Sequence, residues 1–364
     1  MFLRAASVLL LASLSGCPKQ PAAPSGPEWD TTPRLPAPLA GSYTRVEEVP
    51  PDPALAAFLK GRRWDAALSG AAAGLALQLV NEPAGGPGLT RWRVREALWK
   101  AGYPFPVADA RAWVAVDEVG SPPPPLTEWL AAFPEGDDLG LVRARGNENV
   151  VWIGLRATPT ANVGRIPRQL PEGGSFTIPA NPGARWMVSD ANGELLHGEL
   201  DAPATVECNS VGEWMVEIVP ATGASALFPV YVGMVPPELA LIRTVTAVRT
   251  PADALHRAET LLREVRDAYG STALQRDFVL DAGARSLLRG DAGSADGVRT
   301  SLGLDPAGTM LFQCSGTTVE ACIDTVVWKP ENRLALLDDQ SALGLAADVD
   351  GSGVQLVGIV SVTH

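Results

Sequence analysis

The spacing of apolar positions divides the chain into three regions. Apolar residues recur mainly at helical spacing over residues 54–158, alternate in short runs over 165–236, and return to helical spacing over 250–364. A period near 3.6 predicts amphipathic helices, whereas alternation predicts half-buried strands. The pattern therefore predicts a multidomain α+β protein with an N-terminal α/β module (54–158), a central all-β domain (165–236) and a C-terminal module of helices and strands (250–364).

In the N-terminal region, helices are expected to precede strands. Residues 54–79 are rich in Ala and Leu and predict one helix, and residues 89–101 predict a second helix that ends at Gly102. Apolar runs at 139–142 and 150–155 then predict two strands.

Three arginines, Arg91, Arg93 and Arg95, fall in the second predicted helix. Side chains two positions apart in a helix do not face each other. We therefore predict that these arginines form a solvated surface and not one binding site.

The central region consists of short alternating runs with no helical stretch between them. Strands are predicted at residues 175–178, 185–188, 214–219 and 227–232. Asn192-Gly193 is typical of a two-residue hairpin turn. Evenly spaced strands joined by polar turns predict an immunoglobulin-like β-sandwich, a fold that by itself implies no chemistry.

Three helix starts are visible in the C-terminal region. Thr250 precedes Pro251 and can cap the first helix, and Asp277 can cap the second. Thr317 and Glu320 stand at the spacing of a capping box for the third.

Residues 259–290 and 318–360 resemble the two halves of the CAP superfamily, which includes cysteine-rich secretory proteins, antigen 5 and pathogenesis-related 1 proteins. The first stretch contains Leu-Asp-x-x-Ala-Arg, and the second has a helix ending in Trp, then Pro-x-x-Arg-x-x-Leu-Leu and two apolar strands. The resemblance covers residues 250–364 and implies an α-β-α sandwich there.

The same resemblance implies that the metal site of the family has been lost. The family's cleft holds two His and two acidic residues, but Asn332 stands where Pro-Gly-His-Arg would place a His, and no His lies between His256 and His364. The family's Gly-Glu-Asn motif is replaced near residues 312–314. An amide is a poor substitute for an imidazole ligand, so we expect no metal, no cofactor and no catalytic residue.

The two outer regions also share an order of elements. Leu-Gly-Leu at 139–141 and the run at 151–155 parallel Leu-Gly-Leu at 343–345 and the run at 356–359. These parallels suggest the hypothesis that residues 54–158 are a second, degenerate CAP-like module.

The first residues read as a bacterial lipoprotein signal. Arg4 precedes an apolar run, and Leu14-Ser15-Gly16-Cys17 resembles the lipobox, which implies a signal peptide over 1–16 and a lipid on Cys17. Residues 17–53 are rich in Pro and predict an extended tether. By the same resemblance, the residues after Cys17 suggest the outer membrane, on either its periplasmic or its surface face.

Charge and cysteine content agree with an envelope location. The net charge of −12 disfavours nucleic acid and anionic head groups as partners, so the lipid is expected to provide the membrane contact. In an oxidising compartment, Cys314 and Cys322 are expected to form a structural disulfide, with a redox pair as the alternative. Cys208 is expected to be a buried small apolar residue.

Polar side chains give no recognisable catalytic unit. His197, His256 and His364 have no nucleophile–base pattern beside them. Asp348-Val-Asp350-Gly-Ser has the start of a calcium loop without its later ligands, and Asp350-Gly351 is better explained as a hairpin turn.

We therefore predict a non-catalytic, lipid-anchored protein with a binding or scaffolding role in the periplasmic or surface envelope, where another envelope protein is its partner. One alternative is a carrier of a small apolar ligand or lipid, in a cavity lined by residues such as Leu262 or Leu287. The other is a hydrolase, which would bring His197 or His256 together with carboxylates in a cleft.

Overall fold

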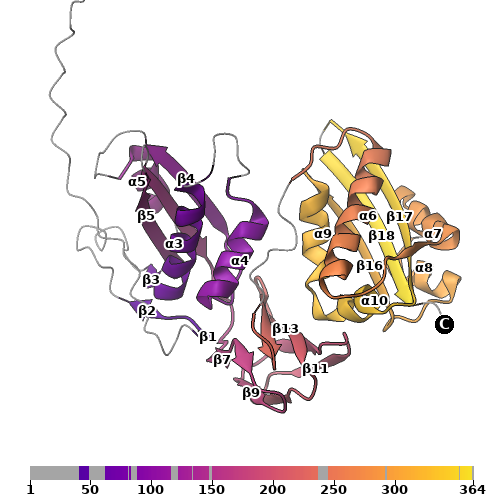
Figure 1. The fold of residues 1–364 in the computed structure, drawn as a ribbon, viewed down its shortest axis with the longest axis horizontal. Coiled ribbons are helices and arrows are strands. Elements are labelled where there is room, and N and C mark those ends of the chain that lie inside the picture. The colour runs from indigo at the N-terminus through magenta and orange to yellow at the C-terminus, as the bar shows by residue number, and fades with distance from the viewer. Residues whose placement is uncertain are drawn as a thin grey trace, which may run out of the picture.

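The computed structural model describes residues 41–48, 62–80, 82, 88–115, 122–132, 134–146, 150–236, 245–291, 293–351 and 353–362. The predicted signal peptide, Cys17, most of the predicted tether and His364 lie outside these ranges. Two modules of mixed helix and strand flank a central group of strands (Figure 1). The chain is thus a mixed α+β protein. None of its described helices is both long enough and apolar enough to cross a membrane.

The N-terminal module is a five-stranded sheet with helices on both faces. Its elements are β1 (Ser42–Tyr43), β2 (Glu47–Glu48), β3 (Arg63–Asp65), α3 (Ala66–Val80), α4 (Arg91–Ala101), β4 (Asp109–Ala115), α5 (Pro124–Ala131), β5 (Asp138–Arg145) and β6 (Val150–Ala157). The sheet order is β2-β3-β5-β6-β4, and β1 pairs with β7 (Ile166–Pro167) of the central part. Apolar side chains of α3 and α4 pack on one face of the sheet, and those of α5 pack on the other.

The central part contains strands only. They are β7, β8 (Gln169–Leu170), β9 (Ser175–Ile178), β10 (Arg185–Ser189), β11 (Leu195–Glu199), β12 (Ala204–Glu207), β13 (Gly212–Val219) and β14 (Ala226–Val232). One sheet has the order β11-β10-β13-β14-β8, and β12 pairs with β9 in a second. The four predicted strands are present, and the residues between the two sheets belong to the same core as α3 and α4.

The hairpin prediction at Asn192-Gly193 is wrong in its loop length. The last pair of the β10–β11 hairpin is Ser189 with Leu195, so the loop spans residues 190–194. Asp190 Oδ1 accepts hydrogen bonds from the amides of Asn192 and Glu194, both at 2.8 Å, and this side chain holds the longer loop in place.

The C-terminal module is a four-stranded sheet between two helical layers. Its elements are α6 (Pro251–Ala268), β15 (Gln275–Arg276), α7 (Phe278–Arg289), α8 (Ala295–Leu302), β16 (Thr309–Gly316), α9 (Val319–Val327), η1 (Pro330–Asn332), α10 (Arg333–Leu337), β17 (Ser341–Asp350) and β18 (Gly353–Val362). The order is β15-β17-β18-β16. Side chains of α7 and α8 pack on one face, and those of α6, α9 and α10 pack on the other.

The two outer modules share one topology. In each, a short strand (β3 or β15) pairs in parallel with the first strand of a long hairpin, β5–β6 or β17–β18. The second strand of that hairpin pairs antiparallel with β4 or β16. The helices follow in the same order, since α3, α4 and α5 occupy the chain positions of α7, α8 and α9.

Matching glycines reinforce this correspondence. Leu141 pairs with Gly154, and Leu345 pairs with Gly358. A Cβ on Gly140 would lie 2.5 Å from the Leu68 carbonyl carbon, and one on Gly344 would lie 2.2 Å from the Leu280 carbonyl carbon. Each module thus needs glycine at the same place, where the hairpin touches the first turn of its helix.

Two N-terminal predictions need correction. The predicted helix over 54–79 starts only at Ala66, because Arg63–Asp65 is strand β3 and Asp65 Oδ1 accepts the Leu68 N–H at 2.8 Å to begin the helix. Residues 42–48, assigned above to the tether, pair in β1 and β2. Strand β4 was not predicted at all.

The C-terminal helix starts are confirmed in part. Thr250 forms a capping box with Asp253, and Asp277 caps α7. The box predicted from Thr317 to Glu320 is wrong, because Thr318 is the N-cap of α9. Glu320 instead accepts the Thr246 N–H at 2.9 Å. Helix α8 was not predicted from the sequence, because it is short and Val298 is its only buried residue.

The cysteines behave as predicted. Cys314 on β16 and Cys322 on α9 form a disulfide with their Cα atoms 5.7 Å apart. Cys208 is free and fully buried, and burial raises the pKa of its thiol to about 11. The hairpin predicted at Asp350-Gly351 is present, but Asp350 is the last residue of β17 and pairs with Gly353, so the turn begins at Gly351.

The buried carboxyl of Asp65 is expected to make the N-terminal module more stable in mild acid. Burial raises its pKa from 3.8 to about 7, and nearby Asp138 adds to the rise. Between about pH 4 and pH 7 the folded chain keeps this proton while the unfolded chain loses it, so stability falls as pH rises through that window. The change is at most about 4 kcal/mol. Hydrogen exchange of the α3 amides at pH 5 and pH 8 measures it, and Asp65→Asn should remove most of the slope. An equal slope in both proteins would rule out this role.

Candidate ligand-binding cleft

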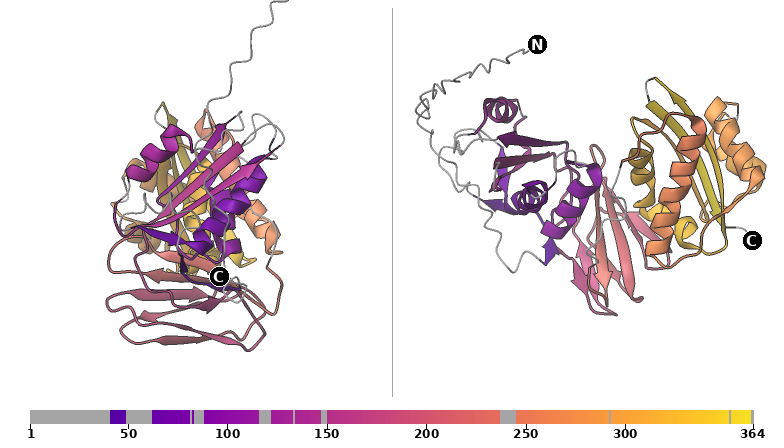
Figure 2. Two further views of the ribbon diagram at one scale, coloured as in Figure 1. Left: turned by 90° about the vertical axis from the view of Figure 1, so that its left-hand side faces the viewer. Right: turned by 45° about the horizontal axis from the view of Figure 1, so that its top comes forward.

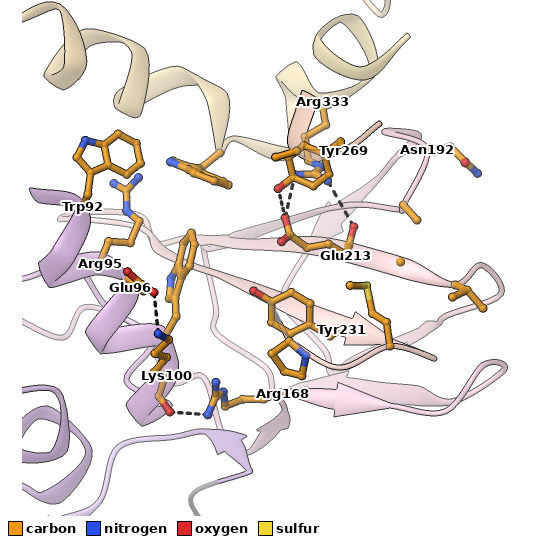
Figure 3. A pocket seen from close by; sticks show the side chains of 18 residues that line it. Trp92, Arg95, Glu96, Lys100, Arg168, Asn192, Glu213, Tyr231, Tyr269 and Arg333 are labelled. Carbon is orange, nitrogen blue, oxygen red and sulfur yellow. Dashed lines mark hydrogen bonds and ion pairs between the residues drawn. The ribbon is translucent and has the colours of Figure 1, made fainter. Parts of the chain in front are cut away.

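A cleft of about 800 Å³ lies where the three parts of the chain meet. Helix α4 forms one wall, strands β13 and β14 form the floor, and the C-terminal module forms the opposite wall (Figure 3). The lining residues are Trp92, Arg95, Glu96, Trp99, Lys100, Arg168, Ala191, Asn192, Val211, Gly212, Glu213, Tyr231, Met234, Pro236, Ala268, Tyr269, Trp328 and Arg333. Each part of the chain therefore contributes side chains to one site.

Helix α4 directs one face into this cleft. Thr90 caps its start and Gly102, in the left-handed region, ends it. Trp92, Arg95 and Trp99 follow each other at helical spacing and line the cleft. Figure 3 shows Trp92 and Arg95 on this face of the helix. The Trp99 indole donates a hydrogen bond to the Leu227 carbonyl at 2.9 Å, which fixes its ring over the central sheet.

Three tryptophans pack edge to face at the contact between the outer modules. Trp328, just after α9, lies 5.4 Å from Trp99 and 6.0 Å from Trp92, measured between ring centroids. The Arg95 guanidinium lies 5.9 Å from the Trp92 ring and 5.8 Å from the Trp99 ring. Such stacking gives the site a rigid aromatic wall.

A buried ion pair joins the same two modules. The Arg95 guanidinium donates to the Asp324 carboxylate, and Arg91 Nε lies 3.6 Å from its other oxygen. The Asp324 side chain is fully buried, and burial raises its pKa although both arginines oppose the rise. A buried pair of this kind is costly to break because either partner alone would be an uncompensated charge.

A second ion pair joins the central strands to the C-terminal module. Arg333 is fully buried, lies 3.2 Å from Glu213 Oε1 and stacks 4.9 Å from the Tyr269 ring. The Tyr269 hydroxyl donates to the same Glu213 oxygen at 2.5 Å. Burial raises the pKa of Tyr269, so its phenol stays neutral at physiological pH. A Cβ on Gly193 would lie 2.7 Å from the Arg333 carbonyl carbon, so this turn needs glycine to approach.

The charge of the lining differs from that of the whole chain. Four cationic side chains (Arg95, Lys100, Arg168 and Arg333) and two anionic ones (Glu96 and Glu213) line the cleft, and Asp324 pairs with Arg95 just behind the lining, so cations exceed anions by one in a chain whose net charge is −12. Low-dielectric aromatic walls concentrate such a local field. The arrangement therefore favours a ligand that combines an apolar body with negative charge.

The residues singled out from the sequence lie elsewhere. Asn332 is buried in η1 and donates to the Val326 carbonyl at 2.7 Å, so it packs inside the module while its neighbour Arg333 lines the cleft. His197 and His256 are exposed and line none of the described cavities. Leu262 and Leu287 belong to packed cores. Within the described ranges, no three His, Cys, Asp or Glu side chains are placed to share a metal ion.

The prediction that the α4 arginines are merely solvated is wrong. Arg91 and Arg95 are four positions apart, so they share a face, and both reach Asp324. Arg93 points elsewhere and pairs with Glu82 at 2.8 Å. The i,i+4 spacing was visible in the sequence, but the partner carboxylate lies in another module.

Comparisons with known proteins leave the family of the chain open. No family model matches, and no curated protein matches. A cysteine-rich secretory protein from Staphylococcus aureus is a structural neighbour with 12% identity and a TM-score of 0.26, over 77% of this chain and 94% of that chain. That neighbour bears the family name that the C-terminal motifs resemble, but a likeness this weak does not assign the chain to a family.

Proposed function

We propose that this chain is a lipid-anchored envelope protein that binds an anionic amphipathic molecule in the cleft between its modules, without catalysing a reaction. The observation that carries the proposal is the cleft itself, with aromatic walls and a cationic excess in an acidic protein. Clefts lined by aromatic rings with a few placed charges are typical of ligand sites.

The state of the charged groups supports binding over bond-making chemistry. Glu213 is held by Arg333 and by the Tyr269 hydroxyl, and Glu96 pairs with Lys100 at 2.7 Å. Carboxylates fixed in ion pairs are poorly placed to exchange protons with a substrate. The contacts of Glu213 with Arg333 and Tyr269 join the floor of the cleft to its C-terminal wall, which lowers the entropic cost of binding.

The architecture that we infer is a pair of related modules around an immunoglobulin-like sandwich, in which the C-terminal module, and by its matching topology the N-terminal one, is CAP-like. The shared strand order and the matching glycines support the pairing. The lipobox-like Leu14-Ser15-Gly16-Cys17 supports an anchor through Cys17 in the outer membrane, with the tether between the lipid and the cleft.

Fluorescence titration with 8-anilinonaphthalene-1-sulfonate tests the proposed site. This probe combines aromatic rings with one negative charge, and 1-N-phenylnaphthylamine has the same rings without the charge. The chain starting after Cys17, which keeps every described element, is expected to bind the sulfonate at one saturable site. It should bind the uncharged probe about tenfold more weakly, because the cationic excess attracts only the anion.

A matched pair of charge reversals locates the binding. Lys100→Glu places a negative charge in the cleft, and Arg263→Glu places one on the exposed side of α6. The first is expected to weaken sulfonate binding about tenfold, and the second to leave it within about twofold. Equal effects of the two variants, or equal affinity for both probes, would refute the proposal.

A further inference from the structure

The two related modules differ at the outer edge of their first strand. In the N-terminal module, β2 lies along β3 and pairs Glu47 with Asp65 and Glu48 with Trp64 in antiparallel. In the C-terminal module, β15 is the last strand of its sheet, and no described segment pairs with its outer side. The N-terminal module therefore shows what this fold accepts at that edge.

The register of the sheets makes the two edges comparable residue by residue. Trp64 pairs with Leu139, and Arg276 pairs with Leu343. Because Leu139 and Leu343 each precede the glycine that touches the helix, Asp277 corresponds to Asp65 and Phe278 corresponds to Ala66.

In the N-terminal module, Val46, just before β2, makes two hydrogen bonds to the end of β3 and the start of α3. The Val46 carbonyl accepts the Ala66 N–H at 2.9 Å, and the Val46 N–H donates to Asp65 Oδ2 at 2.7 Å. Asp65 Oδ1 meanwhile accepts the Leu68 N–H. Val46 alone thus provides the hydrogen-bond partners of the Ala66 N–H and of Asp65 Oδ2 at the start of α3.

The same donor and acceptor are open in the C-terminal module. Asp277 Oδ1 accepts the amides of Val279 and Leu280 at 2.7 and 3.0 Å. Neither Asp277 Oδ2 nor the Phe278 N–H has a partner among the described residues. Both groups that Val46 uses at the other edge are therefore present and unoccupied here.

The side chains at this edge are also unusually exposed. Phe278 is 81% exposed, the largest fraction among the large apolar side chains described, and Val279 is 42% exposed. Their counterparts Ala66 and Ala67 are buried. Helix α7 lies on the side of its module that faces away from the N-terminal module (Figure 1), and Figure 2 shows the same outer position. An apolar cluster beside an open strand edge marks an interaction surface.

Charge indicates the composition of the segment that would bind there. Arg285 and Arg289 lie four positions apart on the exposed side of α7, and neither has an acidic partner among the described residues. Arg276, at the position equivalent to Trp64, already pairs with Glu259 and Asp281, so the uncompensated positive charge beside this edge comes from Arg285 and Arg289. A segment with acidic residues therefore complements this edge.

We propose that the outer edge of β15 binds an extended segment of another envelope protein by strand addition, with an apolar residue at the position of Val46 followed by acidic residues. Its main chain would donate to Asp277 Oδ2 and accept from the Phe278 N–H, and its apolar side chain would cover the Phe278 ring. Main-chain bonds of this type supply affinity, and alternate side chains supply specificity.

A labelled peptide with the sequence of residues 42–48, Ser-Tyr-Thr-Arg-Val-Glu-Glu, is the direct probe, because this segment covers the equivalent edge in the same chain. Fluorescence anisotropy with the chain starting after Cys17 should give saturable binding.

Phe278→Pro removes only the donor N–H and the ring, at the first helical position where Pro is favoured. Asp277, with φ −121° and ψ 123°, already has the conformation that a following Pro requires.

Two variants separate the main-chain bond from the side chain. Phe278→Ala keeps the N–H and should weaken peptide binding about threefold, whereas Phe278→Pro should weaken it at least about tenfold. Unchanged binding by Phe278→Pro would overturn the proposal, as would a lack of saturable binding to the unaltered chain. Sulfonate binding in the cleft should be the same in both variants, so failure of this proposal is distinguishable from failure of the proposed function.

Discussion

Replacing Gly344 with alanine is expected to unfold the C-terminal module, at a cost of about 4 kcal/mol or more. The added Cβ would lie 2.2 Å from the Leu280 carbonyl carbon and 2.5 Å from the carbonyl oxygen. Neither atom can move without displacing the first turn of α7, which is anchored by Asp277. Relief therefore requires β17 and α7 to separate, and that exposes the core between them.

A second glycine of the same sheet provides the control. Gly316 on β16 has open space around the position of an added Cβ, so Gly316→Ala should change stability by less than about 1 kcal/mol. Urea unfolding of both variants, followed by hydrogen exchange of the β17 and β18 amides, gives the comparison. Similar stabilities would show that the contact between Gly344 and α7 yields more easily than the geometry implies.

Asp324→Ala is expected to loosen the contact between the two outer modules by about 3–5 kcal/mol. The carboxylate is fully buried, and its removal leaves the Arg95 guanidinium, 20% exposed, without its counterion between two tryptophan rings. Because Trp92, Trp99 and Trp328 surround the pair, tryptophan fluorescence in a urea titration should report this separation as an early transition.

Two further variants show whether the effect comes from an unpaired charge. Arg91→Ala removes a partner that is 61% exposed and should cost less than about 1 kcal/mol. The double variant Arg95→Met with Asp324→Leu replaces the pair by apolar groups and should recover most of the loss. If the double variant were as unstable as Asp324→Ala alone, packing and not charge would explain the result.

The features that could be predicted from the sequence, such as helix starts, are those formed by residues close together along the chain. Thr250 and Asp277 mark helix starts because their side chains bond amides within the next turn. The disulfide was predicted from the proximity of Cys314 and Cys322 along the chain and from the expectation of an oxidising compartment. Strand β3 was missed because Arg63–Asp65 lies within an Ala-rich run, and its strand character comes from pairing with β5, which begins at Asp138.

The cleft could not be predicted from local sequence signals, because its lining residues are far apart along the chain. Arg333 looked like part of a family motif next to Asn332, yet it binds Glu213 of a different part of the chain. Trp99 and Trp328 could each be predicted as core residues, but their contact depends on how the modules are docked. A single sequence contains no information on which modules meet, so chemistry at their junction had to come from the structure.

Because all three parts of the chain line the cleft, ligand binding requires that they are folded and docked together. No module alone contains the lining, so a chain with one part unfolded, truncated or cleaved has no site to fill. Any ligand would in turn shift the equilibrium toward the docked form, by about 2.7 kcal/mol at a hundred times its Kd. Occupancy would then report that all three parts of the protein are present and correctly joined.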